Sequence, residues 1–144
     1  MEWAILEAFD APDATTVTAA DLAGVPPERW SAIQFALTPS LQLLALRWPV
    51  HTLWERVQHG EPVCELEPGA TTLRVWRQDL RVFHRVIDAA ERAALQAIQG
   101  GATFAAVCER IADHVPEADG AEVAAAFVAT WLADGVLSSL RVTV

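Results

Sequence analysis

The sequence has no lysine, few cysteines and no long apolar run, and each shortage argues against a class of function. All ten basic residues are arginine, against nineteen acidic residues, which gives a formal net charge of -9. Such an acidic chain is a poor candidate for nucleic acid, because most non-specific DNA affinity comes from neutralising phosphates. An anionic partner, such as an acidic peptide segment, is expected only where the arginines gather.

The cysteines and the apolar residues argue against a disulfide framework and a membrane span. Cys64 and Cys108 have no CxxC spacing, so we interpret them as reduced, buried small side chains. No uncharged apolar stretch approaches the ~20 residues that a membrane span needs. Glu2, Glu7 and Asp10 stand where a secretory signal has basic residues. We therefore expect a soluble, cytoplasmic protein with no membrane partner.

Catalytic and metal-binding motifs are also missing. There is no GxSxG, no phosphate-binding glycine-rich loop, no GxGxxG and no HExxH. The histidines are scattered, without ligand spacing, at His51, His59, His84 and His114. The sequence therefore predicts no catalytic residue, no metal site, no cofactor and a non-enzymatic role. An enzyme with an unrecognised site is the least favoured alternative.

What is present is a hairpin pattern from Thr72 to Val86, TLRVWRQDLRVFHRV, with a turn expected at Gln78 and Asp79. Side chains alternate between the two faces of a strand. One face is predicted to carry Leu73, Val75, Leu80, Val82 and Val86. The other is predicted to carry the candidate binding residues, which are Arg74, Trp76, Arg81, Phe83 and Arg85.

This arginine and aromatic face has two interpretations. It can hold a partner chain by charge, by stacking or by added backbone pairing. Alternatively, the hairpin is an ordinary amphipathic one, with its aromatics under another part of the protein and its arginines solvated. The sequence leaves both open.

The first half predicts short elements. A helix over residues 2–9 is expected to bury Trp3, Leu6 and Phe9. Thr18 is expected to begin a second short helix, capped by its hydroxyl or by Asp21, that ends at Gly24. Residues 31–37 and 41–47 predict a hairpin around Thr38-Pro39-Ser40. Residues 50–58 predict a helix that buries Leu53, Trp54 and Val57. Residues 60–69, with two prolines, are the best candidate for an internal boundary.

The second half is more regular. Asp88 with Glu91, Thr103, and Asp119 with Glu122 predict the starts of three helices. Residues 136–144 can return as a strand. We predict an α+β fold in which residues 1–66 form a helix, hairpin and helix subdomain. Residues 67–144 are predicted to form a winged-helix-like subdomain of a hairpin and three helices.

Five stretches of the sequence, in order, resemble a known family. They are EWAILEAFDAPDA, PERWSAIQFALTPSLQLLALRWPVHTLW, LRVWRQDLRV, ERAALQAIQGGATFAAVCERI and WLADGVL. Together they resemble the C-terminal two-thirds of HvfC/BufC-like partner proteins. Those proteins accompany multinuclear non-haem iron enzymes that oxidise ribosomally made peptides, as in bufferin and methanobactin pathways. Full-length relatives usually carry a further helical domain before the first stretch, which these 144 residues lack.

The resemblance implies a non-catalytic partner that binds a precursor peptide and presents it to the iron enzyme. The second half also resembles winged-helix modules that receive a leader peptide as an added strand beside their third helix. By that analogy, the hairpin from Leu73 to Val86 and the helix from Glu122 to Ala133 flank the leader.

A winged-helix DNA-binding domain is the alternative, because the family has also been labelled DNA-binding and the arginine hairpin resembles a wing. The helix that starts after Asp119 presents Glu122 and Asp134 and no arginine. A helix without basic or amide side chains is a poor reader of base edges. Peptide recognition is therefore favoured over DNA binding.

Overall fold

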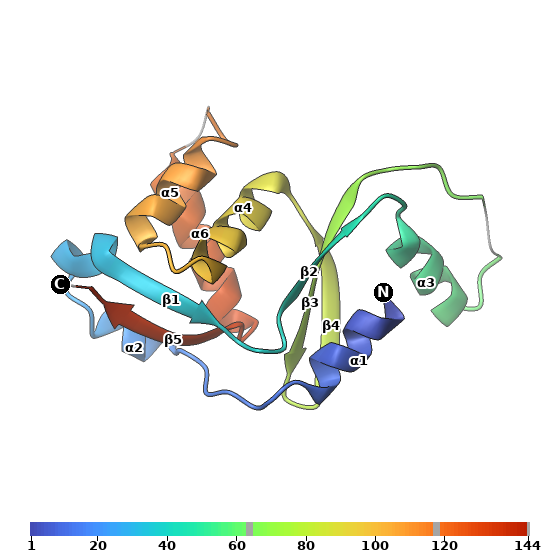
Figure 1. Cartoon of the computed structure of the whole chain (residues 1–144), viewed down its shortest axis with the longest axis horizontal. Helices are drawn as coiled ribbons and strands as arrows, with labels where there is room; N and C mark the ends of the chain where they lie inside the picture. The colour runs from blue at the N-terminus through green and yellow to red at the C-terminus, as the bar shows by residue number, and fades with distance from the viewer. Residues whose placement is uncertain (63–64, 117–118, 144) are drawn as a thin grey trace.

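A computed structural model describes residues 1–62, 65–116 and 119–143 and has helices packed on two antiparallel sheets (Figure 1). The elements in chain order are α1 (Glu2–Asp10), α2 (Ala19–Ala23), the 3-10 helix η1 (Pro27–Ala32), β1 (Ile33–Leu37), β2 (Gln42–Leu46), α3 (Val50–Gln58), β3 (Thr71–Gln78), β4 (Arg81–Ile87), α4 (Ala89–Gln99), α5 (Phe104–Ala112), α6 (Gly120–Ala133) and β5 (Leu137–Val142). The predicted α+β class is confirmed.

The predicted pairing of the first two strands is wrong. β1 pairs with β5, whereas β2 joins β3 and β4 in a sheet of order β2-β3-β4. The backbone N–H of Thr38 donates to the carbonyl of Val136, the residue before β5, at 2.9 Å. This hydrogen bond holds the turn after β1 beside the start of β5. The turn therefore passes the chain from one sheet to the next. Both sheets contain strands from each side of the predicted boundary at residues 66 and 67.

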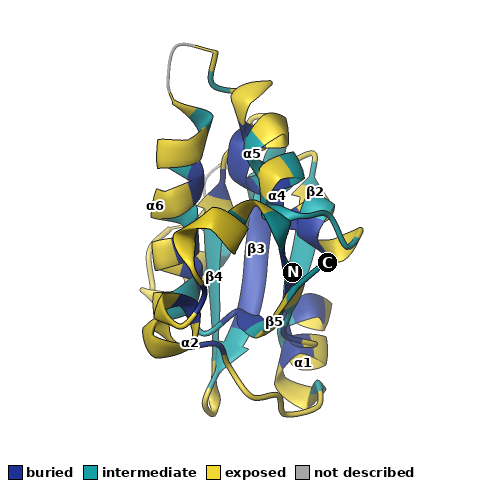
Figure 2. Cartoon of the chain, turned by 90° about the vertical axis from the view of Figure 1, so that its left-hand side faces the viewer, coloured by how far each residue is buried: buried dark blue, intermediate teal, exposed yellow. Residues whose placement is uncertain are grey.

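The three-stranded sheet is covered on both faces, which buries its central strand. Four consecutive residues of β3, from Leu73 to Trp76, are buried, although their side chains alternate between the two faces. Leu73 and Val75 pack against Ala4 and Ala8 of α1. Figure 2 shows β3 as the buried centre of the sheet, with the edge strand β4 beside it.

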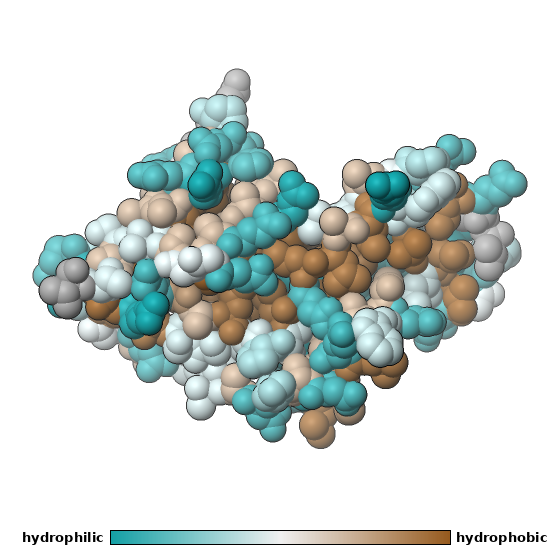
Figure 3. All heavy atoms as spheres, in the orientation of Figure 1, coloured by the Kyte–Doolittle hydropathy of each residue, from teal (hydrophilic) through white to brown (hydrophobic). Residues whose placement is uncertain are grey.

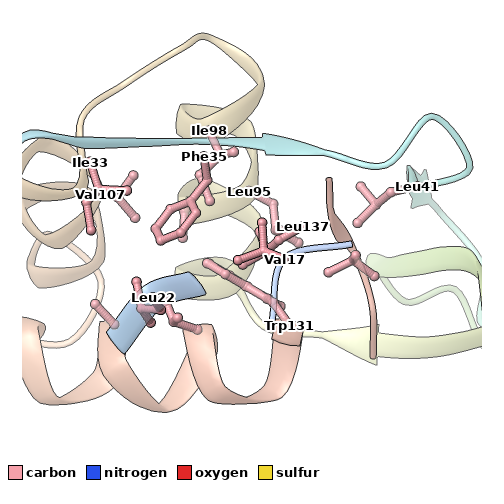
Figure 4. Packing of buried hydrophobic residues seen from close by; sticks show 14 of the residues in the cluster. Val17, Leu22, Ile33, Phe35, Leu41, Leu95, Ile98, Val107, Trp131 and Leu137 are labelled. Carbon is pink, nitrogen blue, oxygen red and sulfur yellow. The ribbon is translucent and has the colours of Figure 1, made fainter. Parts of the chain in front are cut away.

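The main core lies on the other side of this sheet, between the β1-β5 pair and the C-terminal helices (Figure 4). Ile33 and Phe35 of β1 point towards Leu95 of α4 and Val107 of α5. Trp131 of α6 is fully buried in the same cluster. The aromatic residues of β1, α5 and α6 thus fill the space between the small sheet and the helices.

The predicted buried side of the first helix is wrong. Trp3, Leu6 and Phe9 are 72%, 58% and 49% exposed, whereas Ala4 and Ala8 face the sheet. Alanine lets the α1 backbone approach a sheet face already filled by Leu73 and Val75, and a larger side chain has no space there.

The predicted burial in the third helix is also wrong in part. Val57 is 56% exposed, while Leu53 and Trp54 are half-buried. The ring of Trp54 meets His84 of β4 edge to face, with centroids 5.0 Å apart, so this aromatic residue brings α3 into contact with the sheet.

Local start signals of the helices are confirmed. Thr18, Asp88, Thr103 and Asp119 each accept a hydrogen bond from a backbone N–H in the first turn of the following helix. The turn between β3 and β4 lies one residue later than predicted, because Gln78 pairs with Arg81. Leu80 is therefore in the turn and 83% exposed.

The remaining sequence predictions concern membrane spans and cysteines. Among the described residues, no helix has the length and apolar character needed to cross a bilayer. Cys108 is a free, half-buried thiol, and burial raises its pKa above the ordinary value. Cys64 lies outside the described residues.

Candidate functional site

The five candidate residues of the hairpin share one face, as predicted. Arg74 lies opposite Arg85, and Trp76 lies opposite Phe83, across the β3-β4 pair. The rings of Trp76 and Phe83 stack with centroids 5.7 Å apart. The guanidinium carbon of Arg74 lies 4.0 Å from the Trp76 ring centroid, and that of Arg81 lies 5.7 Å from the Phe83 centroid. Arginine and aromatic side chains therefore alternate in contact along this face.

The C-terminal helices cover part of this face. Arg74 is 0% exposed and Trp76 is 5% exposed, so neither can touch a partner in this conformation. Phe83 and Arg85 are half-buried, and Arg81 is exposed. The face is therefore interior at β3 and accessible at β4, and only Arg81, Phe83 and Arg85 are within reach of a bound chain.

Glu91 of α4 organises the buried part of the site. Its Oε1 atom accepts hydrogen bonds from Arg85 at 2.7 Å, from the Trp131 indole N–H at 3.0 Å and from Arg74 at 3.3 Å. Its Oε2 atom accepts a second bond from Arg85 at 2.8 Å. The other end of the Arg74 guanidinium donates to Asp134, which follows α6. One carboxylate thus connects β3, β4, α4 and α6.

The charges of this cluster balance, because two arginines face two carboxylates. Burial lowers the pKa of Arg74 below its ordinary value, and the nearby positive charge of Arg85 lowers it further. Hydrogen bonding to Asp134 and attraction to Glu91 oppose this change. Arg74 stays charged because the ordinary pKa of a guanidinium lies far above neutral pH. The cluster therefore positions its groups by charge rather than by exchanging protons.

Sequence reasoning missed Glu91, Trp131 and Asp134 as parts of the site. The sequence predicts Glu91 only as part of a capping box, but its side chain points into the core and only its backbone N–H donates to Asp88. A signal was present, since Ala94 and Leu95 lie three and four residues later and are buried on the same helix face.

A groove runs beside the accessible part of this face, between β4 and α6. It has a volume of about 610 Å³, with Arg85, Val86 and Ile87 from β4 and Ala126, Phe127 and Thr130 from α6 among its lining residues. β4 is the last strand of its sheet, so within residues 1–62, 65–116 and 119–143 no further strand pairs with its outer edge. Such an edge presents unpaired backbone N–H and C=O groups.

The described side chains offer little for chemistry or metal binding. No three histidine, cysteine, aspartate or glutamate side chains among them gather in a geometry that could hold a metal ion. Arg77, the remaining arginine of the hairpin, donates to the carbonyl of Phe9 and to the carboxylate of Asp13, both at 2.6 Å. It therefore fixes the segment after α1 to the hairpin.

No protein-family description matches the chain, and no curated protein is similar to it.

Proposed function

We propose that this protein is a non-catalytic partner that binds a ribosomally made precursor peptide and presents it to a multinuclear non-haem iron enzyme. The leader part of the peptide adds as a strand along the outer edge of β4, in the groove opposite α6. The observation that carries this proposal is the outer edge of β4, with which no strand in the described part of the chain pairs, beside a groove of about 610 Å³. An extended peptide there forms main-chain hydrogen bonds with the strand, which supply affinity.

The side chains of the groove give this binding its selectivity. Arg85 is 37% exposed and is held by two hydrogen bonds to Glu91, so its position is fixed before a peptide arrives. A guanidinium held in this way can donate its remaining N–H groups to an oxygen of the peptide and loses little side-chain entropy on binding. Val86 and Phe127 offer apolar contacts for neighbouring peptide side chains.

The small residues of α6 allow a chain to approach closely. Ala126 and Thr130 are exposed and line the groove. The iron enzyme as partner rests on the resemblance of the five sequence stretches, and this chain contributes binding and orientation while the enzyme contributes the oxidation.

Filling the groove from α6 tests the proposal. Ala126→Trp places an indole in the groove, whereas Ala125→Trp, on the neighbouring exposed position outside the lining residues, is the matched control. Calorimetry with the leader segment of a precursor peptide of this class should show binding at least about tenfold weaker for Ala126→Trp only, a loss of about 1.4 kcal/mol. Equal affinity of the two variants would remove the groove from the proposal.

The partner role has its own test. Co-expression of the chain with the neighbouring iron enzyme and precursor, followed by size exclusion, should give one complex that contains all three. Failure to co-elute would contradict the partner role even if the leader binds. A salt-sensitive shift of duplex DNA in a gel would instead favour the DNA-binding alternative.

A further inference from the structure

The first helix carries its large apolar side chains on the outside. Residues three and four apart share a helix face, so Ala4 with Ala8 face the sheet and Trp3 with Leu6 face outward. Trp3 is 72% exposed and Leu6 is 58% exposed. The short α1 helix therefore packs on the sheet through its small residues and leaves its larger apolar ones exposed.

A groove next to α1 extends this apolar surface to α3. It has a volume of about 470 Å³, and its lining includes Trp3 from α1 and Leu53, Trp54 and Val57 from α3. Figure 3 shows hydrophobic side chains gathered over α3 on the right-hand side of the molecule, with hydrophobic and hydrophilic ones mixed in the region of α1. We call Trp3, Leu6, Phe9 and the lining of this groove the α1–α3 surface. A continuous exposed apolar surface of this kind marks an interaction site more often than isolated apolar residues do.

Acidic residues lie among the exposed apolar ones. Glu7 is four residues after Trp3, and Asp10 is four residues after Leu6, so both lie on the outward side of α1. Residues 1–28 contain no arginine, lysine or histidine. Arg77, which contacts the end of α1, is already paired with Asp13. The α1 side of the apolar surface is therefore flanked by negative charge, while Arg56 on the α3 side is paired with Glu61.

The negative charge of α1 favours one kind of binding partner over a second copy of the chain or a lipid bilayer. In a two-fold dimer through α1, the same acidic residues of the two copies would face each other, which is unfavourable. An anionic bilayer would be repelled for the same reason. A helix with an apolar stripe flanked by lysine or arginine complements both the apolar and the acidic parts of the surface.

We propose that the α1–α3 surface binds a helix of a partner protein that carries an apolar stripe with basic residues on either side. Apolar side chains of that helix enter the groove between α1 and α3, and its basic residues meet Glu7 and Asp10. This site is separate from the peptide groove, because the two grooves have no lining residue in common.

Two matched peptides test the charge requirement. Each is a synthetic helix of about 18 residues, long enough to be partly helical alone, with the same leucine stripe. One has lysine on both flanks of the stripe, and the other has glutamate. Calorimetry should show binding of the lysine-flanked peptide and at least about tenfold weaker binding of the glutamate-flanked one. Equal binding of the two peptides, or binding of neither, would overturn the proposal.

Variants of the protein locate the site. Leu6→Ser should weaken the lysine-flanked peptide by about tenfold, since it removes most of one buried leucine contact. Leu80→Ser removes another exposed leucine, which is 83% exposed in the hairpin turn, and should leave the affinity unchanged. Both variants should keep the wild-type circular dichroism spectrum. They should also keep wild-type leader affinity, which separates this test from that of the β4 groove.

Two further measurements distinguish the other occupants. Sedimentation velocity should show a monomer over the concentrations used, and a dimer that Leu6→Ser dissociates would assign the surface to a second copy. Co-sedimentation with phosphatidylcholine vesicles should show no binding, and binding that Leu6→Ser abolishes would assign it to a lipid surface. Either result would overturn the partner helix.

Discussion

Replacing Glu91 with glutamine tests whether the buried ion cluster holds the sheet to the helices. The change keeps the size of the side chain but removes its charge. The side chain of Glu91 is 3% exposed and accepts hydrogen bonds from two arginines and from Trp131. Glutamine has one acceptor oxygen and turns an N–H₂ group towards the remaining donors. Arg74 would then be compensated only by Asp134.

The expected loss in the free energy of unfolding follows from the burial of Glu91 and Arg74. Removing one member of a buried ion pair costs about 3 to 5 kcal/mol, because the other charge is left without compensation. Arg74 keeps Asp134, and Arg85 is 37% exposed, so water compensates part of its charge. We therefore expect the lower end, about 3 kcal/mol. That is a large part of the ~5–15 kcal/mol by which a domain is stable.

Urea unfolding followed by circular dichroism measures this loss. With a denaturant slope of about 2 kcal/mol/M, the midpoint of Glu91→Gln should fall by about 1.5 M. Glu109→Gln removes a charge from the exposed side of α5 and should change the free energy of unfolding by less than about 0.5 kcal/mol. The double change Arg74→Met with Glu91→Leu should recover part of the loss, since it removes both buried charges. A midpoint for Glu91→Gln equal to that of Glu109→Gln would refute the structural role of the cluster.

Two further predictions concern pH and backbone conformation. Burial against α3 lowers the pKa of His84 below its ordinary 6.5, so the unfolded chain binds more protons and stability falls as the pH drops below about 6.5. The urea midpoint should therefore fall less between about pH 7.5 and 5.5 in His84→Gln than in the wild type. An equal fall in both proteins would assign the pH dependence to other groups. Gly135 has φ +64°, and an added Cβ would meet only ordinary contacts, so Gly135→Ala should cost about 1 kcal/mol in urea unfolding through conformation alone. Gly69→Ala, where no atom lies within 4 Å of the added Cβ, is its control and should be close to neutral, and equal midpoints would contradict the conformational cost.

Local signals in the sequence predicted the elements, while long-range contacts decided their pairing and burial. The start of α4 at Asp88 depends on one side chain and a backbone N–H three residues away, so it can be read directly. The partner of β1 lies about a hundred residues along the chain in β5, and no local pattern specifies it. Burial of Trp3 was predicted because large apolar side chains are usually inside. The space under α1 was already filled by Leu73 and Val75, which sequence alone does not reveal.

For the hairpin as well, the sequence predicts the local pattern of side chains but not their burial. Alternation of side chains correctly predicts that Arg74 and Arg85 share a face, but it cannot say which of them a neighbouring helix covers. Both arginines donate to Glu91 on α4, so this shared contact does not distinguish them. Arg74 is buried and Arg85 half-buried because they lie on the central and the edge strand of the sheet.

The two proposed surfaces adjoin the same three-stranded sheet. The central strand β3 places Leu73 and Val75 under α1 and directs Arg74 towards Glu91 on the opposite face. A partner helix would lie on the α1 face of this sheet, whereas a peptide strand would extend the sheet beside β4. The grooves proposed for the two molecules have no lining residue in common. A chain that brings a flexible peptide to an enzyme requires this property, since it must hold both molecules at the same time.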